Sequence, residues 1–150
     1  MWYLLEKDVK LQGVRGVRYL YHDPSHSPMK VHRPLAVTRV LTGTEVALSP
    51  QCCGESGTLA VSRPDVSIQL RFRKEEVLWS GVAAMRQAGE SVKVLTSCPS
   101  CLQGLARFSD DTRTQPDYIV VEMARHLLGE NWLDEFVGKA NAGRVERVLL

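Results

Sequence analysis

Three short apolar runs, each followed at once by a polar or cysteine-bearing turn, constrain the fold of this chain most strongly. The runs and their turns are 17–21 before 22–26, 45–48 before 49–54, and 91–96 before 97–101. Short apolar runs bounded by turn residues are typical of strands. Helical patterns separate the three runs, and strands that alternate with helices predict a parallel sheet covered by helices.

The carboxyl ends of parallel strands lie at one edge of a sheet, and ligands of such sheets bind outside that edge. All three polar turns follow a predicted strand. We therefore expect them to meet, although about 75 residues separate the first from the last. The predicted fold class is α/β: a small parallel sheet flanked by helices, with the three turns at the strand carboxyl ends and a helical C-terminal extension.

Two long helices are predicted between the strands. Residues 29–41 form the first crossover, and Gly43 follows in a position that a helix C-cap favours. The second helix begins at Pro64 and ends at Gly89, and every fourth position from 66 to 82 is occupied by Val66, Leu70, Lys74, Leu78 and Val82. Alternation at 66, 68, 70 and 72 also fits a strand. The charged continuation and the end signals favour the helix.

The C-terminal third of the sequence predicts three further helices. The first is a short helix over residues 102–108, and the second is opened by Pro116 and closed before Gly129. The last begins at Asn131 and places Trp132 and Phe136 at the spacing of core residues. We expect a single domain over 1–150, with its core at about 17–108 and the helical extension at about 116–150.

Composition narrows the classes of function. Of the 150 residues, 44% are hydrophobic and 24% are charged, which is typical of a soluble globular protein. The net charge of +2 gives no reason to expect nucleic acid as a partner. No apolar run approaches the roughly 18 residues of a membrane span, and the N-terminus becomes charged too early for a signal peptide. We expect a cytoplasmic protein.

Disulfides are rare in the reducing cytoplasm, so the four cysteines do not indicate a disulfide framework. Metal binding or redox chemistry is the leading interpretation. Cys52 and Cys53 are adjacent, and Cys98 and Cys101 form a CxxC pair. Neighbouring side chains of an extended backbone point apart, so adjacent cysteines reach different irons of a cluster more readily than one small ion. This favours an iron–sulfur cluster over tetrahedral zinc. The same spacing also fits a thiol–disulfide pair, or buried thiols without metal.

The segment 52–67, which begins Cys-Cys-Gly, resembles the signature of the cysteine-rich CCG domain family. That family includes the cysteine-rich subunit of heterodisulfide reductase and the iron–sulfur subunit of glycolate oxidase. The segment His22-Asp-Pro-Ser-His26 resembles the family's first motif, usually HDPCH, and the CxxC pair follows in the expected order. Ser25 stands where the family has a cysteine.

The resemblance implies that Cys52, Cys53, Cys98 and Cys101 hold a 4Fe–4S-type cluster. Gly54, Ser25 and His22 would then lie at the cofactor site, where backbone amides near Gly54 donate hydrogen bonds to sulfur. His22 and His26 flank Ser25, and either could donate to a cluster sulfur or take the vacant ligand place. The resemblance implies no catalytic residue in this chain.

The tail 125–150 resembles the C-terminal end of long bacterial FAD-linked oxidases, which carry a flavin domain related to D-lactate and glycolate dehydrogenases. This implies that the chain is part of a larger oxidoreductase and passes electrons from a flavin that oxidises a 2-hydroxy acid. FAD would lie outside this chain, and the partners would be the flavin and ferredoxin-like domains. A docking domain that has lost the cluster and a zinc-binding module are the competing hypotheses.

One charged run complicates the predicted second helix. Arg71, Arg73 and Lys74 are followed directly by Glu75 and Glu76. The simplest interpretation of such a run is a solvated helix face.

Overall fold

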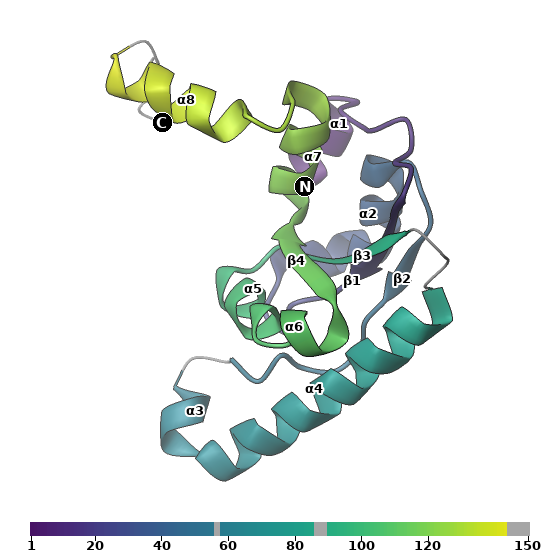
Figure 1. Cartoon of the computed structure of the whole chain (residues 1–150), viewed down its shortest axis with the longest axis vertical. Coiled ribbons are helices and arrows are strands. Elements are labelled where there is room, and N and C mark those ends of the chain that lie inside the picture. Colours follow the sequence, from purple (N-terminus) through teal and green to yellow (C-terminus); the bar gives the residue numbers. More distant parts are fainter. Residues whose placement is uncertain (56–57, 86–89, 144–150) are drawn as a thin grey trace.

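The three predicted strands belong to a four-stranded sheet in which all strands are parallel (Figure 1). The structure, a computed structural model, describes residues 1–55, 58–85 and 90–143. The strands are β1 (Val17–Tyr21), β2 (Val46–Leu48), β3 (Ser91–Thr96) and β4 (Thr114–Tyr118). Their order across the sheet is β2-β1-β3-β4, so β1 and β3 occupy the centre.

One face of the sheet is covered by α1 (Trp2–Glu6), α2 (Pro34–Thr42) and α7 (Ile119–Leu128). Successive side chains of a strand point to opposite faces, and Tyr19 and Tyr21 of β1 point to this one. The buried core on this face is formed by Leu11, Tyr19, Tyr21, Val37, Leu41, Val46, Leu95, Ile119 and Met123.

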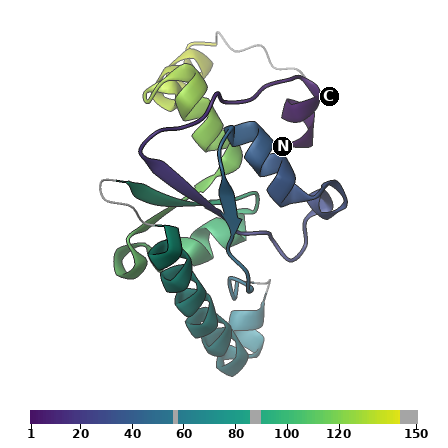
Figure 2. The ribbon, with the colours of Figure 1, turned by 90° about the vertical axis from the view of Figure 1, so that its right-hand side faces the viewer.

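The opposite face is covered by α4 (Pro64–Met85) and α5 (Pro99–Ala106), with the short α6 (Ser109–Thr112) beside α4 (Figure 2). Its core contains Leu20, Leu78, Val82, Val92, Val94, Leu105 and Phe108. The chain therefore leaves β1 towards one face and β3 towards the other. Open parallel sheets form ligand sites between two such neighbouring strands, where the following connections lie on opposite faces.

The predicted helix over 29–41 is divided in two. A short 3-10 helix, η1 (Pro28–His32), comes before α2, and Arg33 between them has a left-handed backbone with φ of 51°. The cause is Pro34, because a proline disfavours helical backbone at the residue before it. The C-cap at Gly43 is confirmed, with φ of 63°.

The predicted second helix is confirmed as α4, and the strand interpretation of residues 66–72 is wrong. The predicted end at Gly89 lies outside the described residues. The short α3 (Leu59–Ser62) precedes α4. None of the helices within the described ranges combines the length and the apolarity that crossing a bilayer requires.

Pro116 does not open a helix, as the sequence predicted, but lies in β4, where it pairs with Val94 of β3. The φ angle that proline imposes suits extended backbone as well as a first helical turn. β4 is an edge strand, and an edge strand tolerates a residue without an N–H donor. The helix α7 starts after it, at Ile119.

The last helix, α8 (Trp132–Asn141), lies at the end of the molecule, away from the sheet (Figure 1). It has no buried residue, and Phe136 is 51% exposed. The prediction that Trp132 and Phe136 belong to the core is therefore wrong. The amphipathic spacing exists, but the described part of the chain does not cover the apolar side of this helix.

Candidate metal centre

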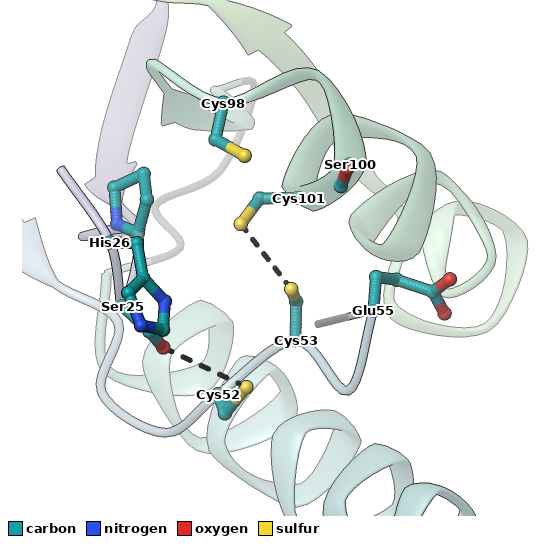
Figure 3. A pocket seen from close by; sticks show the side chains of 9 residues that line it. Ser25, His26, Cys52, Cys53, Glu55, Cys98, Ser100 and Cys101 are labelled. Carbon is teal, nitrogen blue, oxygen red and sulfur yellow. Dashed lines mark hydrogen bonds between the residues drawn. The ribbon is translucent and has the colours of Figure 1, made fainter. Parts of the chain in front are cut away.

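All four cysteines line one cavity of about 150 Å³ at the carboxyl edge of the sheet (Figure 3). The turns after β1, β2 and β3 meet there, as the strand pattern predicts. The cavity is lined by Pro24, Ser25, His26, Cys52, Cys53, Glu55, Cys98, Ser100 and Cys101. In Figure 3 the sulfurs of Cys53, Cys98 and Cys101 point towards one another, whereas the Glu55 carboxylate points away.

The start of α5 positions the CxxC pair. Cys98 is the N-cap residue of this helix, Pro99 is its first residue, and Cys101 lies buried in the first turn. The helix thus begins three residues before the predicted start at 102, because Pro99 is preorganised for a first helical position. The N-terminus of a helix carries a partial positive charge, which favours thiolates placed on it.

The loop after β2 reverses sharply around Cys52 and Cys53. Gln51 and Gly54 both have positive φ, 69° and 78°. The Gly54 N–H donates to Cys52 Sγ over 3.4 Å, which is the type of backbone contact expected for Gly54. A side chain at position 54 would meet Cγ of Arg71 at 3.1 Å. Glycine is therefore required here by both its backbone conformation and its surroundings.

The thiols of Cys53 and Cys101 lie 3.3 Å apart and share a hydrogen bond. This hydrogen bond lowers the pKa of Cys53 to about 4; burial opposes the shift, and His22 adds to it. The same contact raises the pKa of Cys101, which keeps its proton. The shared hydrogen bond thus favours one ionised and one protonated sulfur in this pair, and thiolate is the form that binds metals.

The imidazole of His22 completes a compact set of ligand atoms. One nitrogen of His22 and the sulfurs of Cys53 and Cys101 lie within 4.8 Å of one another, and all three residues are buried. This arrangement is compatible with binding a metal ion. His22 Nδ1 is 3.1 Å from Lys74 Nζ, and Nε2 has no hydrogen-bond partner among the described residues.

Lys74 is fully buried beneath the cysteine loop, so the prediction of a solvated face over 71–76 is wrong at this residue. Its Nζ donates to the carbonyl oxygens of Ser49 (3.1 Å) and Pro50 (2.8 Å) and lies 2.8 Å from Ser49 Oγ. Burial lowers the pKa of Lys74 to about 8, and the nearby thiols partly offset that effect. The signal in the sequence was its place within the apolar every-fourth pattern.

Two further residues of α4 fix the same loop. Ser67 Oγ donates to the Gly54 carbonyl over 3.1 Å, and Arg71 forms an ion pair with Glu55 at 3.1 Å. Arg107, which follows α5, pairs with Glu55 as well. The cysteine loop is thus held by successive turns of one long helix, and sequence reasoning did not identify this support.

The loop also packs closely on α5. A side chain at Gly104 would lie 2.5 Å from Glu55 Cγ and 3.4 Å from Cys53 Cβ. Gly104 therefore lets the cysteine loop approach the helix that carries Cys101.

Ser25 and His26 form the part of the cavity contributed by the turn after β1. Ser25 is exposed, and its hydroxyl donates to Cys52 Sγ over 3.8 Å (Figure 3). Ser25, which the resemblance aligns with a cysteine of the CCG motif, thus lies beside a cavity sulfur. His26 lines the cavity too.

Several buried polar atoms around this edge of the sheet have no hydrogen-bond partner within the described part of the chain. They are Tyr21 Oη, His22 Nε2, Asp23 Oδ1 and Thr96 Oγ1. These residues lie at the ends of β1 and β3 or within two residues after β1. A buried polar group without a partner is costly, and a bound ion is one of the explanations for such a group.

Among known protein families, the model of a domain of unknown function (DUF3400) matches residues 106–150 of this chain. The matched stretch begins at the end of α5 and contains none of the cysteines. No curated protein and no solved structure matches the chain.

Proposed function

We propose that this chain is an iron–sulfur electron-transfer module in which Cys52, Cys53, Cys98 and Cys101 hold the cluster. The observation that carries the proposal is that four sulfurs from two separate loops line one cavity. Clusters of this class are held by four cysteine thiolates. The hydrogen bond with Cys101 lowers the pKa of Cys53, which favours the thiolate form that a cluster requires.

The size of the cavity and the placement of the outer sulfurs favour a cluster over a single ion. Cys53 and Cys101 lie within the compact set with His22, whereas Cys52 and Cys98 line the same cavity outside that set. A cavity of about 150 Å³ exceeds the roughly 30 Å³ share of one water molecule several times. A single small ion would leave most of this space empty and at least one of the four sulfurs unused.

When bound, the cluster supplies one-electron transfer, and the chain's own groups determine how readily it accepts an electron. Gly54 donates its N–H to Cys52 Sγ, and α5 directs its N-terminus at Cys98 and Cys101. Ser25 contacts Cys52 and supplies no thiolate, so the proposed cluster has four sulfur ligands from the protein.

The proposed redox partners are flavin and ferredoxin-like domains of a larger FAD-linked oxidoreductase that oxidises a 2-hydroxy acid of the D-lactate or glycolate type. The support for this part is the resemblance of the tail 125–150 and the order of the three motifs. FAD would be bound by the partner domain.

Zinc is the second candidate, and one observation favours it. His22, Cys53 and Cys101 bring their ligand atoms within 4.8 Å, a compact mixed nitrogen and sulfur set that zinc accepts. In this case Cys98, the N-cap residue of α5, would supply a further thiol from the same cavity.

Elemental analysis of protein produced with a functional cluster-assembly system and purified without oxygen tests the proposal. We expect iron and acid-labile sulfide in equal amounts and little zinc. Stoichiometric zinc without sulfide would favour the second candidate. Protein with neither metal would favour the third interpretation, a docking domain that has lost its cluster.

A further inference from the structure

Lys74 is a buried lysine that faces the cysteine loop instead of a carboxylate. Its side chain has no exposed surface, and within the described residues no acidic side chain forms an ion pair with Nζ. A buried charge is costly unless an opposite charge compensates it. The cavity cysteines, when ionised, interact favourably with the Lys74 ammonium.

The contacts of Lys74 determine the orientation of its protons. An ammonium group has three donors and no acceptor. Two donors are directed at the carbonyl oxygens of Ser49 and Pro50, in the loop that leads to Cys52. The third is directed at Ser49 Oγ and His22 Nδ1, which lie 2.8 and 3.1 Å from Nζ. With Lys74 in its ammonium form, Nδ1 of His22 is therefore the acceptor of this contact.

An acceptor at Nδ1 fixes the tautomer of the imidazole. A neutral histidine carries one proton, so a histidine that accepts at Nδ1 carries its proton on Nε2. Nε2 is buried and has no partner among the described residues, and the imidazole lies beside Cys53 and Cys101. The Nε2–H group is then a free donor at the sulfur site.

We propose that Lys74 and His22 act as a relay that presents positive charge to the sulfur site, with His22 as a hydrogen-bond donor to sulfur and not as a metal ligand. Lys74 is the positioning residue: it holds the imidazole with Nε2–H towards the cavity and fixes the loop carrying Cys52 and Cys53. This inference rests on the proposed iron–sulfur function for its effect on electron transfer, but the relay itself is a property of the metal-free protein.

The relay has a defined consequence for the cluster. Hydrogen bonds to the sulfurs and net charge near the cluster are among the factors that set its reduction potential. A donor and a buried cation both stabilise the reduced form, which carries one more negative charge. Loss of either group therefore lowers the reduction potential while the four cysteine ligands remain.

Nitrogen-15 NMR of His22 in the reduced, metal-free protein tests the relay directly. We expect a protonated Nε2 and an unprotonated, hydrogen-bonded Nδ1. Lys74→Met, which keeps most of the length of the side chain and removes the donors, should move the Nδ1 resonance to the position of a free acceptor. Arg73→Met, at the exposed neighbouring position of α4, is the matched control and should leave the resonance unchanged. A proton on Nδ1 of the wild type would overturn the relay.

The cluster-loaded protein supplies the second test. His22→Phe and Lys74→Met should keep the iron content of the wild type and shift the midpoint potential to more negative values, while Arg73→Met shifts neither. Loss of iron in His22→Phe would identify His22 as a ligand and overturn the inference. If Lys74→Met does not fold, the nitrogen-15 spectrum of wild-type His22 and the iron content and midpoint potential of His22→Phe still test the inference. An iron-free wild type would contradict the proposed function. The NMR experiment on the metal-free protein would still test the contact between Lys74 and His22.

Discussion

At the scale of single residues, the centre depends on how one proton is shared between two cysteines. Cys53 and Cys101 are 3.3 Å apart, and the pKa of Cys53 falls to about 4 because the neighbouring thiol stabilises its thiolate. Proximity of the four sulfurs could be predicted from the sequence, because each cysteine pair follows a strand. The division into one thiolate and one thiol could not be predicted, because it depends on a distance.

The first prediction concerns the thiolate of Cys53. In reduced, metal-free protein, we expect the ultraviolet absorbance of one thiolate to persist from neutral pH down to about pH 4. Cys53→Ser should remove this signal, and Cys52→Ser should keep it. Between about pH 4 and the ordinary thiol value of 9.0 the unfolded chain binds a proton that native Cys53 does not. The contribution of Cys53 to stability is therefore complete above pH 9 and is lost as the pH falls towards 4. No thiolate at pH 7 would contradict the assignment.

The second prediction concerns Gly54. Gly54→Ala places a side chain on a backbone with φ of 78° and against Arg71, so we expect a loss of about 1–3 kcal/mol in the free energy of unfolding. Gly138→Ala is the control, since that position is in α8 and faces open space; alanine there should stabilise by about 0.5–1 kcal/mol. Urea unfolding measures both. Equal effects of the two substitutions would show that the loop does not require its left-handed turn.

At the scale of elements, the long helix α4 does more than cover the sheet. Ser67, Arg71 and Lys74 hold the loop that carries Cys52 and Cys53. Its helical form could be predicted from the every-fourth apolar pattern. Its contacts with the loop could not, because a lysine among charged neighbours is usually solvated and only its place in the apolar stripe indicated burial.

The strand β4 shows a different limit of sequence reasoning. Its residues, Thr114–Tyr118, are mostly polar and include a proline, so they carry little of the apolar signal that identified the other strands. An edge strand pairs with another strand on one side only, so its residues do not need to form a continuous apolar run. The same holds for α8, whose amphipathic pattern indicates a buried side, although none of its residues is buried. An amphipathic pattern shows that a helix can bury one side. Whether that side is buried depends on the tertiary structure.

The third prediction concerns a buried charge cluster that joins α7 to the central strands. Glu122 is fully buried and contacts Lys93 at 2.6 Å, the Tyr19 hydroxyl at 2.7 Å and His126 at 3.1 Å. Burial by itself raises the pKa of Glu122, but hydrogen bonds from these residues outweigh it and hold the pKa below its ordinary value. Glu122→Gln should lower the free energy of unfolding by about 3 kcal/mol, because it leaves the largely buried Lys93 ammonium, 13% exposed, without its carboxylate.

The control for this cluster is Glu130→Gln, an exposed position on the same network that should change stability by less than about 0.5 kcal/mol. The lowered pKa of Glu122 also sets a pH dependence. Its stabilising contribution is present above the ordinary value of 4.5 and is lost as the pH falls through the lower, folded value. The difference between wild type and Glu122→Gln should therefore narrow in acid. A difference independent of pH would contradict the ionised state of Glu122.

At the scale of the whole molecule, the order β2-β1-β3-β4 explains why distant motifs meet. The chain leaves β1 towards α2 on one face and β3 towards α5 on the other, so the turn 22–26 and Cys98 border the same opening. The cysteine loop after β2 borders this opening as well, and Ser67, Arg71 and Lys74 of α4 hold it there. The alternation of strands and helices in the sequence predicts that the three turns meet at the carboxyl edge of the sheet. The fourth strand and the contacts of α4 with the cysteine loop were not predicted.

The central claim is that the four thiols hold an iron–sulfur cluster, and anaerobic reconstitution followed by iron and sulfide analysis tests it most directly. We predict a cluster with about four irons per chain in the wild type. Cys98→Ser should abolish it, and Ser100→Ala, a cavity residue without a thiol, should not. Ser25→Cys should raise the occupancy or change the electron paramagnetic resonance spectrum. A wild type that takes up no iron and sulfide, indistinguishable from Cys98→Ser, would contradict the claim.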